Sequence, residues 1–242
     1  MPEAPLLLAL ADFEPAPEAA STDIAVRGEL QELTRRIAFA PESWSRDDAA
    51  SMRSRFDERA ATWATRDAPE YRLPLEDALR RGGVPRRGRC LEVGSGTGIQ
   101  TPTLVAHFDE VLSIEIAPEM FRQTPSGSST RVLADAASLP LGDGTLDAIV
   151  CVNAPLFAPE YSRVLARAGA VVFVSTRGSQ TPIYLAPADV VAALASLGDR
   201  RFTATTARAG QGTWTVARRD AAPPGSDTSG EQVATAMGTG DE

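Results

Sequence analysis

Residues 91–98 read Leu-Glu-Val-Gly-Ser-Gly-Thr-Gly and decide the fold of this 242-residue chain. Apolar residues lead into the stretch, as in a buried strand, and a helical pattern follows from Ile99. Glycines in such a strand-to-helix turn permit tight backbone angles and leave no Cβ in the way of a ligand. The following helix directs its N-terminal amides and its positive dipole end at whatever binds there. Glu92, two residues before the first glycine, suggests a ligand that also carries positive charge.

A glycine-rich turn of this kind is consistent with more than one function. The fingerprint of dinucleotide-dependent dehydrogenases is G-x-G-x-x-G, and Ile99 stands where its last glycine would be. The turn instead reads G-x-G-x-G, with an acid before it. A tight strand–helix connection that binds no ligand is a further alternative.

Two more acids follow strand-like apolar segments. Glu115 ends the run Val-Leu-Ser-Ile-Glu, and Asp135 ends the run Arg-Val-Leu-Ala-Asp. A doubly wound nucleotide-binding fold places, about twenty residues past its glycines, a carboxylate that holds ribose hydroxyls. Glu115 matches that position and can accept two hydrogen bonds from a vicinal diol. For Glu115 alone, a solvated acid at a strand end is the alternative.

In this order and spacing the segments resemble class I S-adenosylmethionine-dependent methyltransferases, in particular the group with the ubiquinone and menaquinone biosynthesis enzymes. Residues 139–153 resemble the family's "LPF…FD" passage into the fourth strand. Residues 160–170 resemble its "E..RVL.PGG" helix and turn, with Ala168 replacing the proline and Ala170 the second glycine. Residues 56–63 resemble its "FD..A..YD" segment. The resemblance covers roughly residues 50–218.

The resemblance implies S-adenosylmethionine as the cofactor and a small molecule as the methyl acceptor. It implies that Asp135 accepts a hydrogen bond from the adenine amino group while the next backbone amide reaches a ring nitrogen. The predicted cofactor-binding residues are Glu92, Gly94, Ser95, Gly96, Gly98, Glu115, Ile116, Asp135, Ala136 and Asn153. No catalytic residue is predicted, since the sulfonium is itself a strong electrophile.

Four residues are candidates for substrate contact. Trp63 is either part of a cap near the sulfonium, where an aromatic face favours a cation, or ordinary core. Phe157 closes the segment 153–157, which loosely resembles the N-P-P-F/Y motif of amino-group methyltransferases with the spacing changed by one residue. Arg177 and Tyr184 are candidates by position alone. The single histidine, His107, is expected in a surface or second-layer position.

The composition narrows the function classes. The net charge is −8, which argues against a general nucleic-acid binder. Cys90 and Cys151 are expected to be buried and reduced, and no His/Cys cluster suggests a metal site. No apolar run reaches the roughly eighteen residues of a membrane span, and Leu6–Leu10 does not make a signal peptide. We therefore expect a cytoplasmic protein of undetermined oligomeric state.

The alternation of strands and helices predicts an α/β fold. We expect a doubly wound, mainly parallel seven-stranded sheet, Rossmann-like, with an antiparallel last strand and a helical N-terminal cap. The predicted organisation is a flexible segment 1–23, a helical cap 24–87, the cofactor-binding domain 88–219 and a disordered tail 220–242. Strands are predicted near 89–94, 111–116, 131–135, 146–152, 170–175, 202–209 and 212–218. Helices are predicted near 24–40, 46–65, 73–81 and 187–197.

The leading hypothesis is a methyltransferase acting on a small molecule by in-line displacement. The alternatives are an RNA-modifying methyltransferase, a non-catalytic S-adenosylmethionine-binding partner subunit and, disfavoured by the glycine pattern, a nucleotide-dependent dehydrogenase. The helical segments before residue 81 carry Trp44 and Trp63, and we expect them to cover the cofactor and build much of the acceptor pocket.

Overall fold

The computed structural model describes residues 6–7, 24–125, 127, 129–197 and 202–220. The predicted segments 1–23 and 220–242 therefore lie outside it, apart from Leu6–Leu7 and residue 220. Within the described residues the strands form one eight-stranded sheet in the order β1-β7-β8-β6-β5-β2-β3-β4. Their bounds are β1 Leu6–Leu7, β2 Arg89–Val93, β3 Glu110–Glu115, β4 Thr130–Leu133, β5 Leu146–Val152, β6 Leu165–Ser175, β7 Phe202–Ala209 and β8 Gly212–Arg219.

The sheet confirms the predicted fold class. Strands β2 to β6 pair in parallel, while β8 lies between β6 and β7 and is antiparallel to both. The seven predicted strands all form, and the two-residue β1 adds an eighth by pairing in parallel with β7 at one edge. The outcome is a Rossmann-like sheet with its last strand inserted antiparallel.

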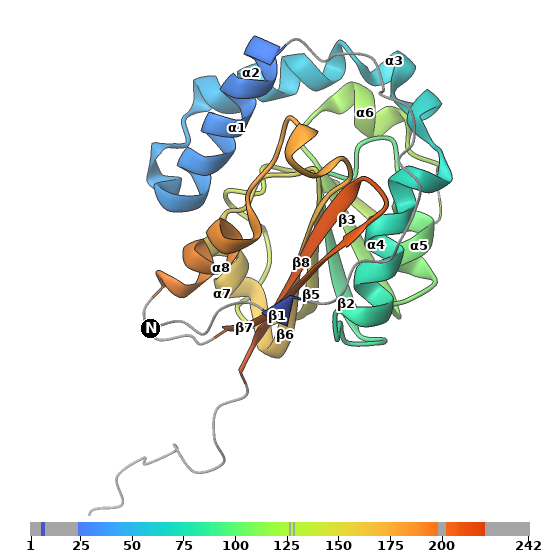
Figure 1. Cartoon of the computed structure of the whole chain (residues 1–242). Coiled ribbons are helices and arrows are strands. Elements are labelled where there is room, and N and C mark those ends of the chain that lie inside the picture. Colours follow the sequence, from blue (N-terminus) through green and yellow to red (C-terminus); the bar gives the residue numbers. More distant parts are fainter. Residues whose placement is uncertain (1–5, 8–23, 126, 128, 198–201, 221–242) are drawn as a thin grey trace, which may run out of the picture.

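Helices cover both faces of the sheet (Figure 1). In β5, Ala148 and Val150 pack with α4 (Pro69–Arg81) and α5 (Thr101–Val105) on one face, whereas Ile149 and Cys151 pack with α7 (Ala158–Val164) and α8 (Pro187–Ala195) on the other. Side chains of a strand alternate between faces, so a strand buried on both sides reads as a continuous apolar run. The α-helices are α1 Ile24–Phe39, α2 Arg46–Asp57, α3 Ala60–Trp63, α4 Pro69–Arg81, α5 Thr101–Val105, α6 Pro118–Gln123, α7 Ala158–Val164 and α8 Pro187–Ala195.

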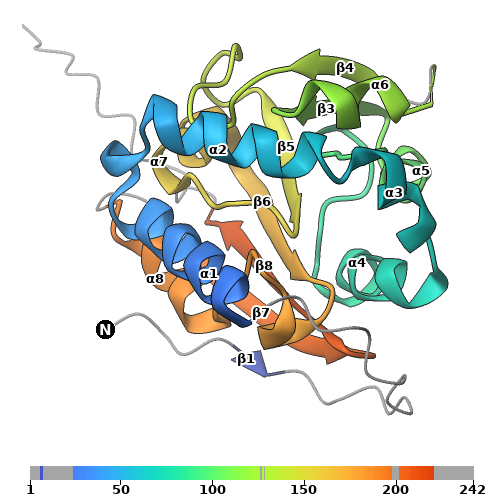
Figure 2. The ribbon, with the colours of Figure 1, turned by 90° about the horizontal axis from the view of Figure 1, so that it is seen from above.

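The predicted helical cap spans residues 24–87, but its last helix, α4, packs on β8 and β7, so only the first three helices are called the lid below. Seen from above in Figure 2, α1 and α2 pass over one end of the sheet. Helix α1 packs on α8, while α2 and α3 pack on α6. Short 3-10 turns join these helices at η1 Pro41–Ser43 and η2 Ala64–Arg66, and a third, η3 Gly178–Gln180, follows β6.

Several element boundaries differ from the sequence prediction. The helix expected over 46–65 breaks after Asp57, whose carboxylate instead accepts a hydrogen bond from the backbone amide of Glu119 in the first turn of α6 (2.8 Å). Helix α4 begins at Pro69 rather than near residue 73, since a proline fits the first helical position. The helix after the glycines starts only at Thr101 and is five residues long.

The turn predicted at residues 168–170 is also different. Strand β6 begins at Leu165, directly where α7 ends, so it is five residues longer than the expected strand. Ala168 keeps a positive φ of 63° inside this strand. The pairing of β5 with β6 shifts register between Leu146 and Ala148, which accommodates the irregular residues.

Both cysteines are buried and free, as expected. Cys90 pairs with Ala148 in the β2–β5 register and Cys151 with Val93, so the two thiols lie on neighbouring strands without facing each other. His107 lies between α5 and β3, and its Nε2 is 3.1 Å from the carbonyl oxygen of Pro85. It therefore lies near the start of β2, away from the glycine turn.

A buried charge cluster attaches α4 to the last strand. Asp77 is 2% exposed and accepts hydrogen bonds from Arg80, Arg81 and the indole N–H of Trp214 in β8. Burial alone would raise the pKa of Asp77, but the hydrogen bonds from Arg81, Trp214 and Arg80 outweigh it and lower that pKa. The carboxylate therefore gives an acceptor to the indole N–H of Trp214, which is buried and would otherwise have none.

We expect Asp77→Ala to lower the free energy of unfolding by about 3 kcal/mol, because removing one partner leaves buried donors unpaired. Urea unfolding followed by circular dichroism measures the change. The matched control is Glu76→Ala on the exposed side of the same helix, which should change stability by less than about 0.5 kcal/mol. Equal effects of the two substitutions would contradict a structural role for the Asp77 cluster.

Candidate functional site

A cavity of about 240 Å³ lies where the lid meets the carboxyl ends of the parallel strands. Most of the predicted site residues line it. From the predicted cofactor set these are Glu92, Gly94, Ser95, Gly96, Glu115, Ile116, Asp135, Ala136 and Asn153, and from the predicted substrate set Trp63, Phe157 and Arg177. Gly98 and Tyr184 are not among the lining residues. The structure thus gathers on one cavity residues that are widely separated in the chain.

The three glycines of the turn lie in different surroundings. Gly94, Gly96 and Gly98 all take positive φ angles, of 65°, 56° and 84°. A Cβ on Gly98 would lie 2.7 Å from the Cγ2 atom of Thr124, so this glycine permits close packing behind the turn rather than facing the cavity. A Cβ on Gly96 would lie 3.4 Å from the indole nitrogen of Trp63. The turn and the lid are therefore in close approach.

Glu115 holds the glycine turn in place. Its carboxylate accepts hydrogen bonds from the backbone amides of Gly96 (2.7 Å), Ile116 (2.9 Å) and Ala117 (2.8 Å). The side chain is buried, so it is not the solvated strand-end acid of the alternative interpretation. Burial raises the pKa of Glu115, while the bonds from Ala117, Gly96 and Ile116 oppose that rise.

Glu92 is a second buried acid, beneath the turn. It accepts hydrogen bonds from the hydroxyls of Ser113 (2.6 Å) and Thr101 (2.8 Å). Burial is the main cause that raises the pKa of Glu92 to about 7, and Glu115 adds a smaller upward contribution. The site therefore contains a carboxyl group that gains or loses its charge near neutral pH, where a cationic ligand would favour the charged form.

Asp135 bonds to the lid as well as to its own loop. Its carboxylate accepts from the backbone amide of Ala137 and from the indole N–H of Trp44, each at 2.9 Å. Trp44 precedes α2 and packs edge-to-face on Phe157, with ring centroids 5.5 Å apart. Trp44 lines the cavity but was not among the predicted site residues, because nothing local connects it to Asp135.

Asn153 joins the ends of two neighbouring strands. It follows β5 with a positive φ of 52°, a conformation that asparagine tolerates better than most residues. Its side-chain amide donates to the hydroxyl of Thr176 (2.9 Å), and its side-chain oxygen accepts from the backbone amide of Thr176 (3.0 Å). Asn153 therefore shapes the cavity wall by tying β5 to the segment that follows β6.

The lid closes over the glycine turn through aromatic contacts. Trp63 packs edge-to-face on Phe56 at 5.5 Å between ring centroids, and the guanidinium of Arg66 lies 4.3 Å from the centroid of its ring. Arg53 of α2 donates to the backbone oxygen of Ile116 (3.2 Å). The contacts of Trp63 with Phe56 and Arg66 lie within the lid, whereas Arg53 connects the lid to the end of β3.

Of the two remaining predicted substrate residues, only one lines the cavity. Arg177 follows β6 and lines the cavity, half-buried. Tyr184 lies seven residues further on, outside the cavity lining, and burial raises the pKa of its hydroxyl.

In the part of the chain that the structure describes, no cluster of His, Cys, Asp and Glu side chains could hold a metal ion. No helix among those residues has the length and apolar character to cross a membrane.

This chain is similar in sequence to known methyltransferases. Residues 91–173 match the methyltransferase domain family. The chain is 33% identical over 109 residues to the biotin biosynthesis bifunctional protein BioHC of Cellvibrio japonicus, an alignment that covers 41% of this chain and 22% of that protein. The chain thus spans about a fifth of that relative.

Solved structures with a similar backbone include a SAM-dependent methyltransferase from Aquifex aeolicus, with a TM-score of 0.54, 19% identity and coverage of 66% of this chain and 97% of that one. A DhpI–SAH complex aligns with a TM-score of 0.55 and 20% identity, covering 71% of this chain and 97% of that chain. At these identities the likeness establishes the fold.

We expect Glu92→Gln to stabilise the protein much more at pH 8 than at pH 4. The pKa of Glu92 lies above its unfolded value of 4.5, so the charged form destabilises the fold increasingly as pH rises from about 4.5 to 7. Glutamine can still accept from Ser113 and Thr101 but cannot ionise, which adds up to about 3 kcal/mol at pH 8. Urea unfolding at both pH values tests this, with the exposed Glu110→Gln as control. A pH-independent difference between Glu92→Gln and wild type would refute the assignment.

Proposed function

We propose that this chain transfers a methyl group from S-adenosylmethionine to a small-molecule acceptor. The premise is that residues 91–173 form a methyltransferase domain of the class I S-adenosylmethionine-dependent type. The observation that carries the proposal is the convergence of three acids, Glu92, Glu115 and Asp135, on one cavity beside a glycine turn. The carboxyl ends of parallel strands are where such folds bind nucleotide-like ligands.

The residues present fit this cofactor. A Cβ on Gly94 would approach the Cβ of Ala154 to 3.1 Å at a positive φ of 65°, so a side chain here would be crowded and its backbone strained. Glu115 is suited to accept from a ribose diol in addition to its backbone donors, since each carboxylate oxygen can accept more than one hydrogen bond. Asp135 and the amide of Ala136 are suited to the adenine edge, and Glu92 to the positively charged end.

S-adenosylmethionine, when bound, supplies an electrophilic methyl group on a sulfonium. The contribution of the chain is then to orient the acceptor and to exclude water, which in favourable cases is worth about 7–11 kcal/mol of the barrier. The lid supports both roles, since Trp63 and Trp44 bring aromatic side chains over the turn and beside Asp135. This division of labour explains why no general base stands out among the cavity residues.

We expect S-adenosylmethionine and its demethylated product to raise the melting temperature and NAD to leave it unchanged. A ligand that binds only the folded state adds roughly 2.7 kcal/mol at a hundredfold excess over its dissociation constant. Differential scanning fluorimetry with each compound makes the measurement. A rise in melting temperature with NAD alone would contradict the proposal and favour the dehydrogenase alternative.

The reaction itself is tested by transfer of labelled methyl groups from S-adenosylmethionine into pools of small molecules and into bulk RNA. Label in small molecules supports the proposal. Label confined to RNA would assign the RNA-modifying alternative, which the net charge of −8 disfavours. Cofactor binding with transfer to neither class would indicate a non-catalytic partner subunit.

We expect Glu115→Ala to weaken cofactor binding about tenfold or more, because charge-assisted hydrogen bonds contribute about 1.5–3 kcal/mol each. The melting temperature should also fall, since the amides of Gly96, Ile116 and Ala117 lose their acceptor. Calorimetry with S-adenosylhomocysteine gives the affinity. Glu110→Ala, at the exposed start of the same strand, is the matched control and should keep wild-type affinity. Unchanged affinity in Glu115→Ala would limit its role to the turn.

A further inference from the structure

The acids that line the cavity all lie in one half of it, whereas the lining arginines come from the lid (Arg55, Arg59 and Arg66) and from the segment after β6 (Arg177). The three lining acids Glu92, Glu115 and Asp135 belong to β2, β3 and the loop after β4, three neighbours at one side of the sheet. The other half lies toward β5 and β6 and is walled by α1 and by the segment after β6. Among the described residues that line this second half, none is acidic.

The second half combines apolar side chains with an arginine. Val26 and Leu30 of α1 face it together with Pro182 and Ile183, and Arg177 lies among them. Because surrounding apolar groups lower the effective dielectric constant, a charge here acts more strongly on a ligand than it would at an open surface. A guanidinium matches the oxygens of a carboxylate or phosphate in a bidentate arrangement.

The backbone that carries Arg177 is held on both sides. Its own amide donates to the hydroxyl of Thr181 (3.1 Å), and the preceding Thr176 is bonded to Asn153. Gln31 of α1 donates from its side-chain amide to the backbone oxygens of Ser179 (2.9 Å) and Thr181 (3.0 Å). The position of the arginine is therefore set by the same contacts that join the lid to β5 and β6.

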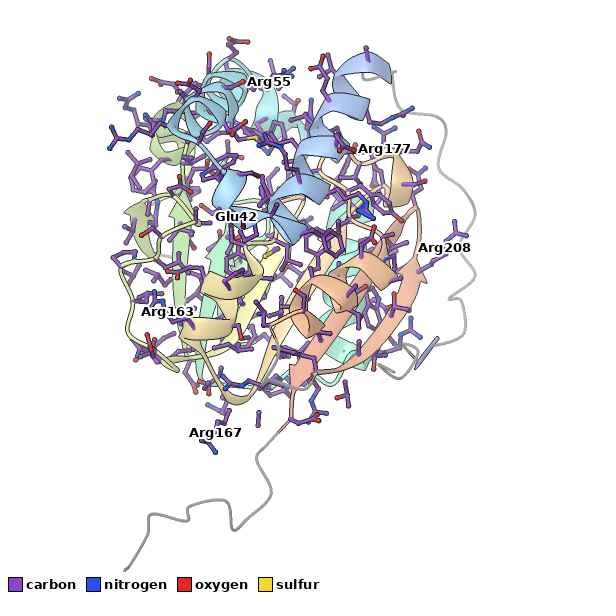
Figure 3. All side chains as sticks on the ribbon, turned by 90° about the vertical axis from the view of Figure 1, so that its left-hand side faces the viewer. Glu42, Arg55, Arg163, Arg167, Arg177 and Arg208 are labelled. Atoms are coloured by element: carbon purple, nitrogen blue, oxygen red, sulfur yellow. The ribbon has the colours of Figure 1, made fainter. Side chains whose placement is uncertain are left out.

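A second lining arginine, Arg55, belongs to α2. Figure 3 shows Arg55 and Arg177 at the end of the molecule where α1 and α2 lie, whereas Arg208 projects from an edge of the sheet and Arg167 lies at the other end. Arg55 forms an ion pair with Glu29 of α1 at 3.3 Å, and that glutamate is 65% exposed. Because solvent screens an exposed acid, Glu29 offsets only part of the positive charge of Arg55, which also lines the cavity.

We propose that the methyl acceptor is an organic anion with an apolar body, and that Arg177 binds its carboxylate or phosphate group. This inference rests on the proposed function, since it takes the acid-lined half as the cofactor site and assigns the other half to the acceptor. Arg177 is thus a specificity-determining residue: it selects acceptors that carry negative charge and holds them beside the sulfonium end of the cofactor site.

The test uses the full chain saturated with S-adenosylhomocysteine and calorimetric titration with matched probes. These are octanoate against octanamide, phenylacetate against phenylacetamide, and phenyl phosphate against phenol. At least one anion should bind tenfold or more tightly than its neutral counterpart. Arg177→Gln should remove that preference while keeping the affinity for S-adenosylhomocysteine within twofold, and the exposed Arg208→Gln should behave as wild type.

Two results would overturn the proposal. The first is that no anion binds more tightly than its neutral counterpart. The second is that Arg177→Gln weakens S-adenosylhomocysteine itself by tenfold, which would place Arg177 on the carboxylate of the cofactor rather than on the acceptor. Failure of S-adenosylhomocysteine to bind the wild-type chain is distinct from both, because it contradicts the proposed function before any acceptor probe is added.

Discussion

The buried carboxylate of Glu115 is the constraint on which the cavity depends. It accepts from Gly96 in the turn after β2 and from two amides that lead into α6, so one side chain sets both the shape of the turn and the start of that helix. Helix α6 is in turn the surface on which α2 and α3 pack. A buried carboxylate must have its oxygens satisfied, and here the donors are backbone amides whose positions define the site.

The lid is held by contacts with the glycine turn and with the ends of β3 and β4. Trp63 closes on Gly96, Arg53 donates to the oxygen of Ile116, and Trp44 donates to Asp135. Each contact reaches a residue that also lines the proposed cofactor half of the cavity. A ligand that bonds to Asp135 must share that carboxylate with the indole of Trp44, so occupancy of the cavity and the position of the lid are coupled.

The distribution of charge follows from the topology of the sheet. In parallel strands the carboxyl ends meet at one edge, so acids that end β2, β3 and β4 gather in neighbouring positions. The segments that complete the other half come from the end of β6 and from α1, and they bring apolar side chains and Arg177, while the other lining arginines belong to the lid. Under the proposed function, the half with the acids takes a cationic nucleoside and the other half takes an apolar molecule with a negative group.

The sequence by itself determined the strands, their order along the chain and the acids at their ends. Each of these strands is a short apolar run that is followed by a glycine turn or by a carboxylate residue. It could not place Trp44 against Asp135, which lie 91 residues apart, or show that Gly98 faces Thr124 instead of the cavity. It likewise could not separate Arg177 from Tyr184, since both were plausible by position and only the packing of α1 on the segment after β6 puts one on the cavity wall. Local patterns record which residues are buried within an element, whereas contacts between distant elements depend on packing that no single segment encodes.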